Sequence, residues 1–314
     1  MIRRLIHIVI LMLSLWALAG EKAMGQEFPW LLQYITNMNT LNPAYVGMWD
    51  RSGLMISTRT NWVGINGAPL NQQLSYFTSI KDQRSGIGLN IQRTNIGREK
   101  RLFFTGDYSY QIRLDMYNYI RFGMRAGIVN YDNNLLDYQL YPDRIPDTEF
   151  ISDIQMYFMT VFGVGAVYFN ENLFISFSVP QVINNTFKVN RSHYSSIYEF
   201  NTAYLAGGYV FKLVNNIQLR ANLLAVATIG RPLYFDAAAV LYLPVNLQFG
   251  FNIRTNGSTC LSAQYTFRNN LRIGFAADYA IIQDIRKYQF GSYEIVIGYE
   301  FNQNKRKSVK PNYF

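Results

Sequence analysis

Apolar and polar residues alternate along most of this chain, and the alternation limits it to a narrow set of folds. From Val245 to Arg254 the sequence reads VNLQFGFNIR, with every odd-numbered position apolar. Successive side chains of a β-strand point to opposite faces, so such a segment has one apolar and one polar face. Almost no stretch has the period of a long amphipathic helix. Ten-residue strands with an apolar face rich in Tyr and Phe are what a closed transmembrane barrel requires.

The first 25 residues have the pattern of a secretory signal peptide. Arg3 and Arg4 form a basic start, and an apolar stretch follows from Leu5 to Ala19. The small residues of Ala23-Met24-Gly25 then fit a signal-peptidase site, which predicts cleavage before Gln26. The apolar run is short for a membrane-spanning helix, so we interpret it as a cleaved signal.

The alternation predicts fourteen strands, and single-chain bacterial barrels favour even numbers. The predicted strands cover residues 53–61, 70–80, 85–94, 102–114, 119–129, 156–169, 173–179, 198–213, 217–227, 234–243, 245–254, 258–267, 271–281 and 293–301. Every second connection is short, and the others include the long segments 130–155 and 180–197. Short periplasmic turns and longer extracellular loops are typical of outer-membrane barrels. We therefore predict an all-β protein, a transmembrane antiparallel β-barrel in the outer membrane of a Gram-negative bacterium.

Two segments flank the predicted barrel of residues 53–301. Residues 26–52 contain apolar side chains and a turn at Asn42-Pro43, and they could plug the lumen or lie along the periplasmic rim. Residues 302–314 form a basic tail on the periplasmic side. That tail is either a solvated end or a docking peptide for a periplasmic partner.

Polar faces of the strands must point inward, because a charge facing lipid at the midplane costs ~2–4 kcal/mol. On the strand 102–114 the inward set is Thr105, Asp107, Ser109, Gln111 and Arg113. Inward glycines suggest bends, or crowding by something inside the barrel. The formal net charge is +9, with the cations scattered among acidic residues. This pattern predicts either an internal network of ion pairs or a cation-lined pore, and with a signal peptide we do not expect nucleic acid to bind.

Residues that could carry catalysis are scarce. Once the signal peptide is removed, His193 is the only histidine, and no Gly-x-Ser-x-Gly elbow accompanies it. No phosphate-binding loop is present, and His and Cys together could supply at most two metal ligands. Cys260, the only cysteine, lies on an alternating strand and is expected to be a small lumen-side residue. We therefore predict no enzyme, no catalytic residue, no metal and no cofactor.

Specific motifs occur at the two ends of the mature chain. They are Gln33-Tyr34, Asn42-Pro43-Ala44-Tyr45-Val46-Gly47, Arg59-Thr60-Asn61-Trp62-Val63-Gly64, Gly67-Ala68-Pro69, Gly291-Ser292-Tyr293-Glu294, Gly298-Tyr299 and the final Pro311-Asn312-Tyr313-Phe314. In this order they resemble the PorP/SprF family of the Bacteroidota, along the whole mature chain. The tail departs from the family pattern, which has Arg where Asn312 stands.

This resemblance implies a non-enzymatic outer-membrane barrel of the type IX secretion and gliding machinery. Members of the family assist the secretion and surface attachment of very large adhesins or enzymes that carry a C-terminal sorting domain. The implied partners are therefore such a secreted surface protein, other type IX secretion components and the lipid bilayer.

The motif residues also have a structural interpretation. Pro43 and Pro69 fix turns, Gly47 and Gly64 permit tight backbone paths, and Trp62 suits a membrane boundary. The motif set comprises Asn42, Pro43, Ala44, Tyr45, Gly47, Arg59, Trp62, Gly64, Pro69, Tyr293 and Glu294. These residues either build the barrel or, in the N-terminal segment and first loop, form a surface that binds a partner.

Two functions remain open at this point. In the first, the long loops contact the exported protein through their aromatic residues, Tyr131, Tyr138, Tyr141, Phe150 and Tyr194. In the second, the protein is a passive porin or solute transporter. Its lumen would then favour anions because of Arg113, Arg121, Arg125, Arg220 and Arg254.

Overall fold

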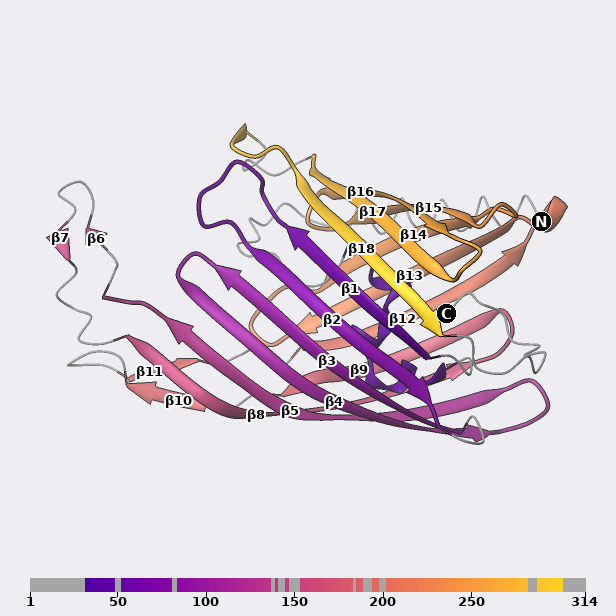
Figure 1. Cartoon of the computed structure of the whole chain (residues 1–314), viewed down its shortest axis with the longest axis horizontal. Helices are drawn as coiled ribbons and strands as arrows, with labels where there is room; N and C mark the ends of the chain where they lie inside the picture. The colour runs from indigo at the N-terminus through magenta and orange to yellow at the C-terminus, as the bar shows by residue number, and fades with distance from the viewer. Residues whose placement is uncertain are drawn as a thin grey trace.

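A closed barrel forms the body of the protein (Figure 1). The computed structural model describes residues 32–48, 52–80, 84–136, 139–140, 145–146, 153–182, 185–188, 194–197, 202–281 and 287–301. Within them, fourteen antiparallel strands form a ring in which β1 (Ser52–Thr60) pairs with β18 (Ser292–Phe301). The predicted antiparallel β-barrel of fourteen strands is confirmed.

The other barrel strands follow the chain around the ring, with β8 beside β5 and β12 beside β9. They are β2 (Leu70–Ser79), β3 (Ser85–Ile96), β4 (Glu99–Arg113), β5 (Tyr119–Asn133), β8 (Ile154–Phe169), β9 (Leu173–Val182), β12 (Thr202–Lys212), β13 (Gln218–Thr228), β14 (Tyr234–Tyr242), β15 (Leu247–Arg254), β16 (Ser258–Thr266) and β17 (Leu271–Ala280).

The two longest connections contain small hairpins that the sequence did not predict. They are β6 (Gln139–Leu140) with β7 (Ile145–Pro146), and β10 (Asn185–Lys188) with β11 (Tyr194–Ile197). Strand β9 also continues past Pro180, where the prediction had ended it. The pairing of β8 with β9 shifts between Phe162 and Val164. A strand tolerates a residue without an N–H group at such an irregularity.

The two ends of the barrel differ (Figure 1). The hairpins β6–β7 and β10–β11 lie at one end, which we call the long-loop end. Strands β4 and β5, β8 and β9, β14 and β15, and β16 and β17 are joined by short turns at the opposite, short-turn end. Short turns are periplasmic in bacterial outer-membrane barrels, so the long-loop end is the external one.

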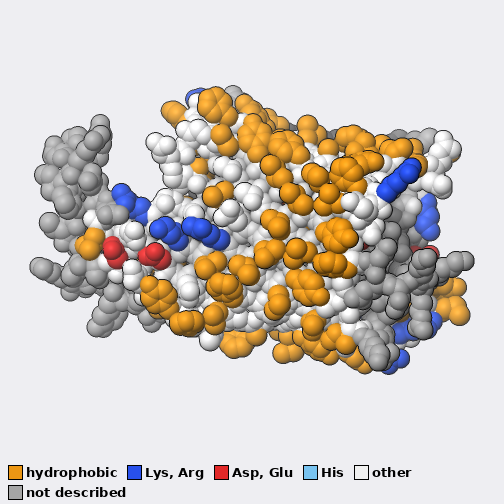
Figure 2. Space-filling view, viewed as in Figure 1, with side chains coloured by type: hydrophobic (Ala, Val, Ile, Leu, Met, Phe, Trp, Pro, Cys, Tyr) orange, Lys and Arg blue, Asp and Glu red, His pale blue; other side chains and the backbone are white. Residues whose placement is uncertain are grey.

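Side chains alternate between the two faces of the barrel wall, as predicted. On β4, Phe104 and Tyr108 are exposed on the outer face, whereas Asp107 and Ser109 are buried inside. Figure 2 shows hydrophobic side chains spread over the outer wall between the two ends. This pattern gives lipid an apolar surface and places the polar residues in the lumen.

Arg113 does not line the lumen, contrary to the prediction. It is the last residue of β4 and is exposed. Its Nε donates a hydrogen bond to the carbonyl oxygen of Asp115 at 2.8 Å. At the end of a strand the side chain can reach the turn and the water around it, so alternation alone does not fix its direction.

The helices in the described residues are single turns of 3-10 type: η1 (Tyr34–Thr36), η2 (Met38–Thr40), η3 (Pro43–Tyr45) and η5 (Val214–Asn216). None of the helices described is long and apolar enough to cross a membrane.

Candidate functional site: the segment inside the barrel

Residues 32–48, which we call the lumen segment, run through the inside of the barrel (Figure 1, indigo). They contain η1, η2 and η3, and all but Thr36 and Thr40 are buried. The described part of the N-terminal region therefore lies in the lumen and contacts the inner faces of strands from both halves of the ring.

One side of the lumen segment makes an apolar contact with the barrel wall. Tyr34, Met38, Leu41 and Tyr45 belong to a single buried cluster. The cluster continues into inward side chains of β8, β9, β12, β13 and β14, namely Val167, Phe169, Phe174, Ala206, Val210, Leu224, Val226, Ala238 and Val240, with Tyr234 at the start of β14. Burying a side chain of this size contributes roughly 1.5–3 kcal/mol to stability relative to leaving it exposed. This apolar contact therefore contributes much of the free energy that keeps the segment in the lumen.

Asn42 links the turn of the lumen segment to the wall. Its Oδ1 accepts a hydrogen bond from the N–H of Ala44 at 2.8 Å, which caps η3, and Pro43 at the first helical position suits that turn. Its Nδ2 donates to Oγ of Ser176 at 2.8 Å and lies 3.1 Å from the carbonyl oxygen of Ala166. The same side chain therefore shapes the segment and binds it to β8 and β9.

Two inward arginines of β5 donate to main-chain carbonyl oxygens of the lumen segment. Arg121 donates to Val46 at 2.8 Å. Arg125 donates to Asn39 at 2.6 Å and to Thr40 at 3.1 Å. Arg125 also pairs with the buried carboxylate of Asp107 at 2.7 Å. These arginines satisfy carbonyl groups that the short 3-10 turns leave without partners.

Glu294 on β18 holds the other end of the lumen segment. Its carboxylate accepts hydrogen bonds from the N–H groups of both Leu32 and Gln33. Arg59 on β1 lies directly opposite Glu294 in the strand register and 3.8 Å from Asp278 of β17. Buried charges are stable only when they are paired and hydrogen-bonded, and here the main chain of the segment supplies two of the donors.

The network of charges continues along β14 and β15. Arg254 pairs with Asp236 at 2.8 Å and with Asp278 at 3.1 Å. The hydroxyl of Tyr34 donates to Asp236 at 3.1 Å. The lumen segment is thereby bonded to this charged network.

These contacts fix the direction of the lumen segment. Glu294 lies near the start of β18, at the long-loop end, and it binds Leu32. Ser109 lies near the end of β4, at the short-turn end, and its hydroxyl donates to the carbonyl oxygen of Val46 at 2.6 Å. The segment thus runs from the long-loop end towards the short-turn end before β1 begins.

Inward glycines provide the space for this segment. A Cβ added to Gly123 would overlap the main chain of Pro43 and Ala44, and one added to Gly165 would overlap the Asn42 side chain. A Cβ on Gly86 would overlap the carbonyl oxygen of Val46. Of the two explanations for inward glycines, crowding inside the barrel therefore holds at these positions.

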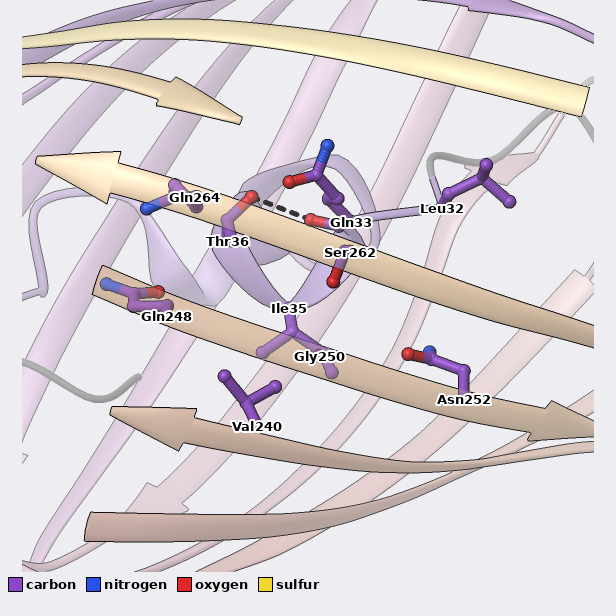
Figure 3. A pocket seen from close by; sticks show the side chains of 10 residues that line it. All are labelled: Leu32, Gln33, Ile35, Thr36, Val240, Gln248, Gly250, Asn252, Ser262 and Gln264. Atoms are coloured by element: carbon purple, nitrogen blue, oxygen red, sulfur yellow. Dashed lines mark hydrogen bonds between the residues drawn. The ribbon is translucent and has the colours of Figure 1, made fainter. Parts of the chain in front are cut away.

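A small cavity remains between the lumen segment and β14–β16 (Figure 3). It has room for about one water molecule and is lined both by polar residues, including Gln33, Thr36 and Gln264, and by the apolar Ile35 and Val240. The hydroxyl of Thr36 donates to the carbonyl oxygen of Gln33 at 2.7 Å, so this hydroxyl is bonded within the lumen segment itself. A space of this size is too small to serve as a solute path.

The remaining motif residues lie in the first loop and its neighbour. Trp62 has a positive φ of 47°, and Gly64 has a φ of 103°. The N–H of Val63 donates to the carbonyl oxygen of Gly291 at 2.9 Å, and Pro69 accepts from the N–H of Asn61 at 2.9 Å. The hydroxyl of Tyr293 donates to the carbonyl oxygen of Phe290 at 2.7 Å. These residues join the β1–β2 loop to the segment preceding β18.

The aromatic residues predicted to bind a partner are only partly described. Tyr131 is buried on β5, with the Arg101 guanidinium 5.6 Å from its ring centroid, so it offers little contact surface. Tyr138, Tyr141 and Phe150 lie outside the described residues, and of Tyr194 only the main chain in β11 is described.

Groups for metal or acid–base chemistry are few in this site. Within the described ranges, no three His, Cys, Asp or Glu side chains come together as a metal site. Cys260 is buried on the lumen side, as predicted. His193 lies outside the described residues.

The sequence did not reveal several residues that hold the segment. Arg125 and Glu294 were recognised as inward or as motif residues, but their partners lie 86 and 262 positions away in the chain. The hydroxyl of Ser178 donates to the carbonyl oxygen of Leu41 at 2.6 Å, and no motif in the sequence had marked this residue as a contact.

A family model described as type IX secretion system membrane protein PorP/SprF matches residues 23–299. The chain belongs to this family. The match includes both the lumen segment and nearly the whole barrel. The family is one of secretion-system membrane barrels rather than an enzyme class. No curated protein matched the chain.

Solved structures with a similar fold are outer-membrane barrels. The TodX monoaromatic hydrocarbon channel (deltaS2 mutant) has a TM-score of 0.51 at 12% identity, over 85% of this chain and 94% of that chain. A Pseudomonas aeruginosa FadL homologue has a TM-score of 0.50 at 12% identity, over 88% and 96%. The CymD monoaromatic hydrocarbon channel has a TM-score of 0.50 at 12% identity, over 88% and 94%. At such identities the likeness shows the fold alone.

Proposed function

We propose that this PorP/SprF protein is a non-enzymatic accessory barrel in the outer membrane. It assists type IX secretion and surface attachment of a large protein with a C-terminal sorting domain, such as an adhesin. The signal peptide is removed before assembly, and the partners are the exported protein and other components of the secretion system. The barrel serves as an anchor and not as a conduit.

The observation that carries this proposal is the occupied lumen. The lumen segment contacts β2, β4, β5, β8, β9, β14 and β18 by hydrogen bonds and packs on an apolar cluster. A porin needs an open aqueous path, and here protein groups occupy the centre of the barrel.

The lumen arginines support the same interpretation. Arg125 and Arg254 form buried ion pairs, and Arg121 donates to Val46, Ser109 and Gln111. Arg220 donates to Asn222 at 2.9 Å and lies 5.0 Å from the ring centroid of Phe174. Cations engaged in this way stiffen the barrel and attract solute anions weakly, which argues against the anion-selective porin.

The contact surface for the exported protein is proposed to include the long loops, residues 134–153 and 183–201. Their aromatic residues Tyr138, Tyr141, Phe150 and Tyr194 are of the types that interfaces favour. The basic tail, residues 302–314, is proposed to face the periplasm.

Affinity purification tests the proposal. The protein, tagged after Phe314, would be captured from detergent-solubilised outer membranes, and co-purifying proteins would be identified by mass spectrometry. We expect a very large surface protein with a C-terminal sorting domain. A version with both long loops shortened is the matched variant, and it should lose that protein while still assembling as a barrel. Recovery of the barrel alone from wild-type membranes would contradict the accessory role.

Planar bilayer recordings test the alternative. The wild-type protein should show no steady conductance, whereas deletion of residues 26–48 should open the lumen. A steady, salt-dependent conductance of the wild-type protein would favour the porin.

A further inference from the structure

Three cations gather on the β3–β4 hairpin at the long-loop end. Along the outer face of β3, the exposed residues Ile87, Leu89 and Ile91 are followed by Arg93. Arg98 in the turn and Lys100 at the start of β4 are also exposed. Figure 2 shows blue side chains between the orange outer wall and the long-loop end. The positive charge therefore lies where the apolar outer surface ends.

The strand register brings these cations close together. Arg93 lies opposite Leu102, and Asn95 lies opposite Lys100, so Arg93 and Lys100 are diagonal neighbours on one face. Such neighbours are separated by about 7–8 Å, a distance that two long cationic side chains can bridge around one anion. Gln72 on β2 lies directly opposite Arg93 and is exposed. The hairpin thus offers two positive charges and an amide on one patch.

The level of this patch matches the outer boundary of the membrane. Lys100 and Tyr110 are ten residues apart on the outer face of β4, and Tyr110 lies near the short-turn end. A tilted strand of about 9–11 residues crosses the hydrocarbon layer. With Tyr110 at the inner boundary, Arg93 and Lys100 lie at the outer one.

We propose that the β3–β4 hairpin binds the phosphate group of an outer-leaflet glycolipid. Arg93, Arg98 and Lys100 hold the phosphate, and the amides of Gln72 and Asn95 hydrogen-bond to the sugar. The acyl chains lie against Leu89 and Ile91 directly below. This inference goes beyond the accessory function and does not depend on it.

Acidic neighbours leave a positive surplus on this patch. Glu99 in the same hairpin forms an ion pair with Arg101. Asp132 on β5 lies opposite Lys100 and borders the patch on its far side. Arg93 is placed away from both acids, beside Gln72 of β2. The phosphate is therefore expected to bind between β3 and the turn and not at the β5 edge.

The test compares lipid binding by native mass spectrometry of the full-length mature protein in a non-ionic detergent. The probes are bisphosphorylated lipid A, the same lipid after removal of its phosphates, and inorganic phosphate as a competitor. The variant carries R93Q, R98Q and K100Q. A matched control carries R84Q, K212Q and R268Q, which change the same charge at exposed positions of the short-turn end.

The expected result is preferential binding of the phosphorylated lipid, weakened about fivefold for each cation removed from the hairpin. The control should bind as the wild type does. Equal weakening by both variants would show an unspecific effect of net charge and overturn the proposal. Equal binding of the dephosphorylated lipid would overturn it too, as would full competition by inorganic phosphate at the lipid's own concentration.

Discussion

Replacing Asn42 by Ala removes the side chain that binds the turn of the lumen segment to the barrel wall. The wild-type amide accepts one hydrogen bond from Ala44 and donates to Ser176 and to neighbouring carbonyl oxygens on β8 and β9. The substitution leaves the barrel strands intact. It therefore acts on the position of the segment and not on the fold of the ring.

The size of the effect follows from these bonds. The two N–H groups and the oxygen of the amide correspond to three hydrogen bonds, and each contributes roughly 1 kcal/mol net. Their loss lowers the free energy of displacing the segment by about 3 kcal/mol, which is about a hundredfold in the population of displaced states.

Hydrogen exchange measured by mass spectrometry is the assay. In the wild type the N–H groups of Ala44, Tyr45 and Val46 are hydrogen-bonded within the segment. In N42A these amides should exchange about a hundredfold faster, while those of β4 and β5 keep their rates. The control N118A removes comparable bonds at a short turn, where Asn118 accepts from Tyr168 at 2.6 Å. Unchanged exchange of residues 44–46 in N42A would refute the reasoning.

Three further outcomes are expected. G123V should displace the lumen segment and give a bilayer conductance, because the new side chain overlaps the main chain of the segment. The control is G106V, where no atom lies nearer than 3.9 Å to the added Cβ, and its barrel should show no conductance. R125M leaves the buried carboxylate of Asp107 without its cationic partner and should lower stability by ~3–5 kcal/mol in denaturant unfolding; also replacing Asp107 by an apolar residue should restore only part of it, because the carbonyl oxygens of Asn39 and Thr40 still lack their donor. The hydrogen bond from the Asn118 side chain, and then those from turn N–H groups, lower the pKa of Asp115. The stability from this contact is therefore present at neutral pH and lost as the pH falls through the lowered pKa, and NMR titration should show the pKa rising in N118A.

The barrel could be predicted from the sequence because its rule is local. Each strand needs only a period of two in its sequence. The outward direction of Phe104 and the inward direction of Asp107 follow from their positions along the strand and do not depend on residues far away in the chain. Strand ends were harder to predict. Arg113 and Pro180 lie where turn contacts or a shift in register override the alternation.

The candidate site was only partly predictable. The Asn-Pro-Ala-Tyr motif marked the right residues, and the inward glycines suggested that something crowds the lumen. Their partners could not be assigned, because Asn42 meets Ser176 only when β8 and β9 curve around the same lumen.

Periodicity and motifs, which are properties of neighbouring residues, were enough to predict the class of fold, the number of strands and the family. The occupied lumen and the direction of the segment could not be predicted in this way. These depend on contacts such as that between Leu32 and Glu294, 262 positions apart, which exist only once the ring has closed. The sequence left open whether Glu294 lines an open pore, whereas in the closed ring its carboxylate accepts hydrogen bonds from the main-chain N–H groups of Leu32 and Gln33.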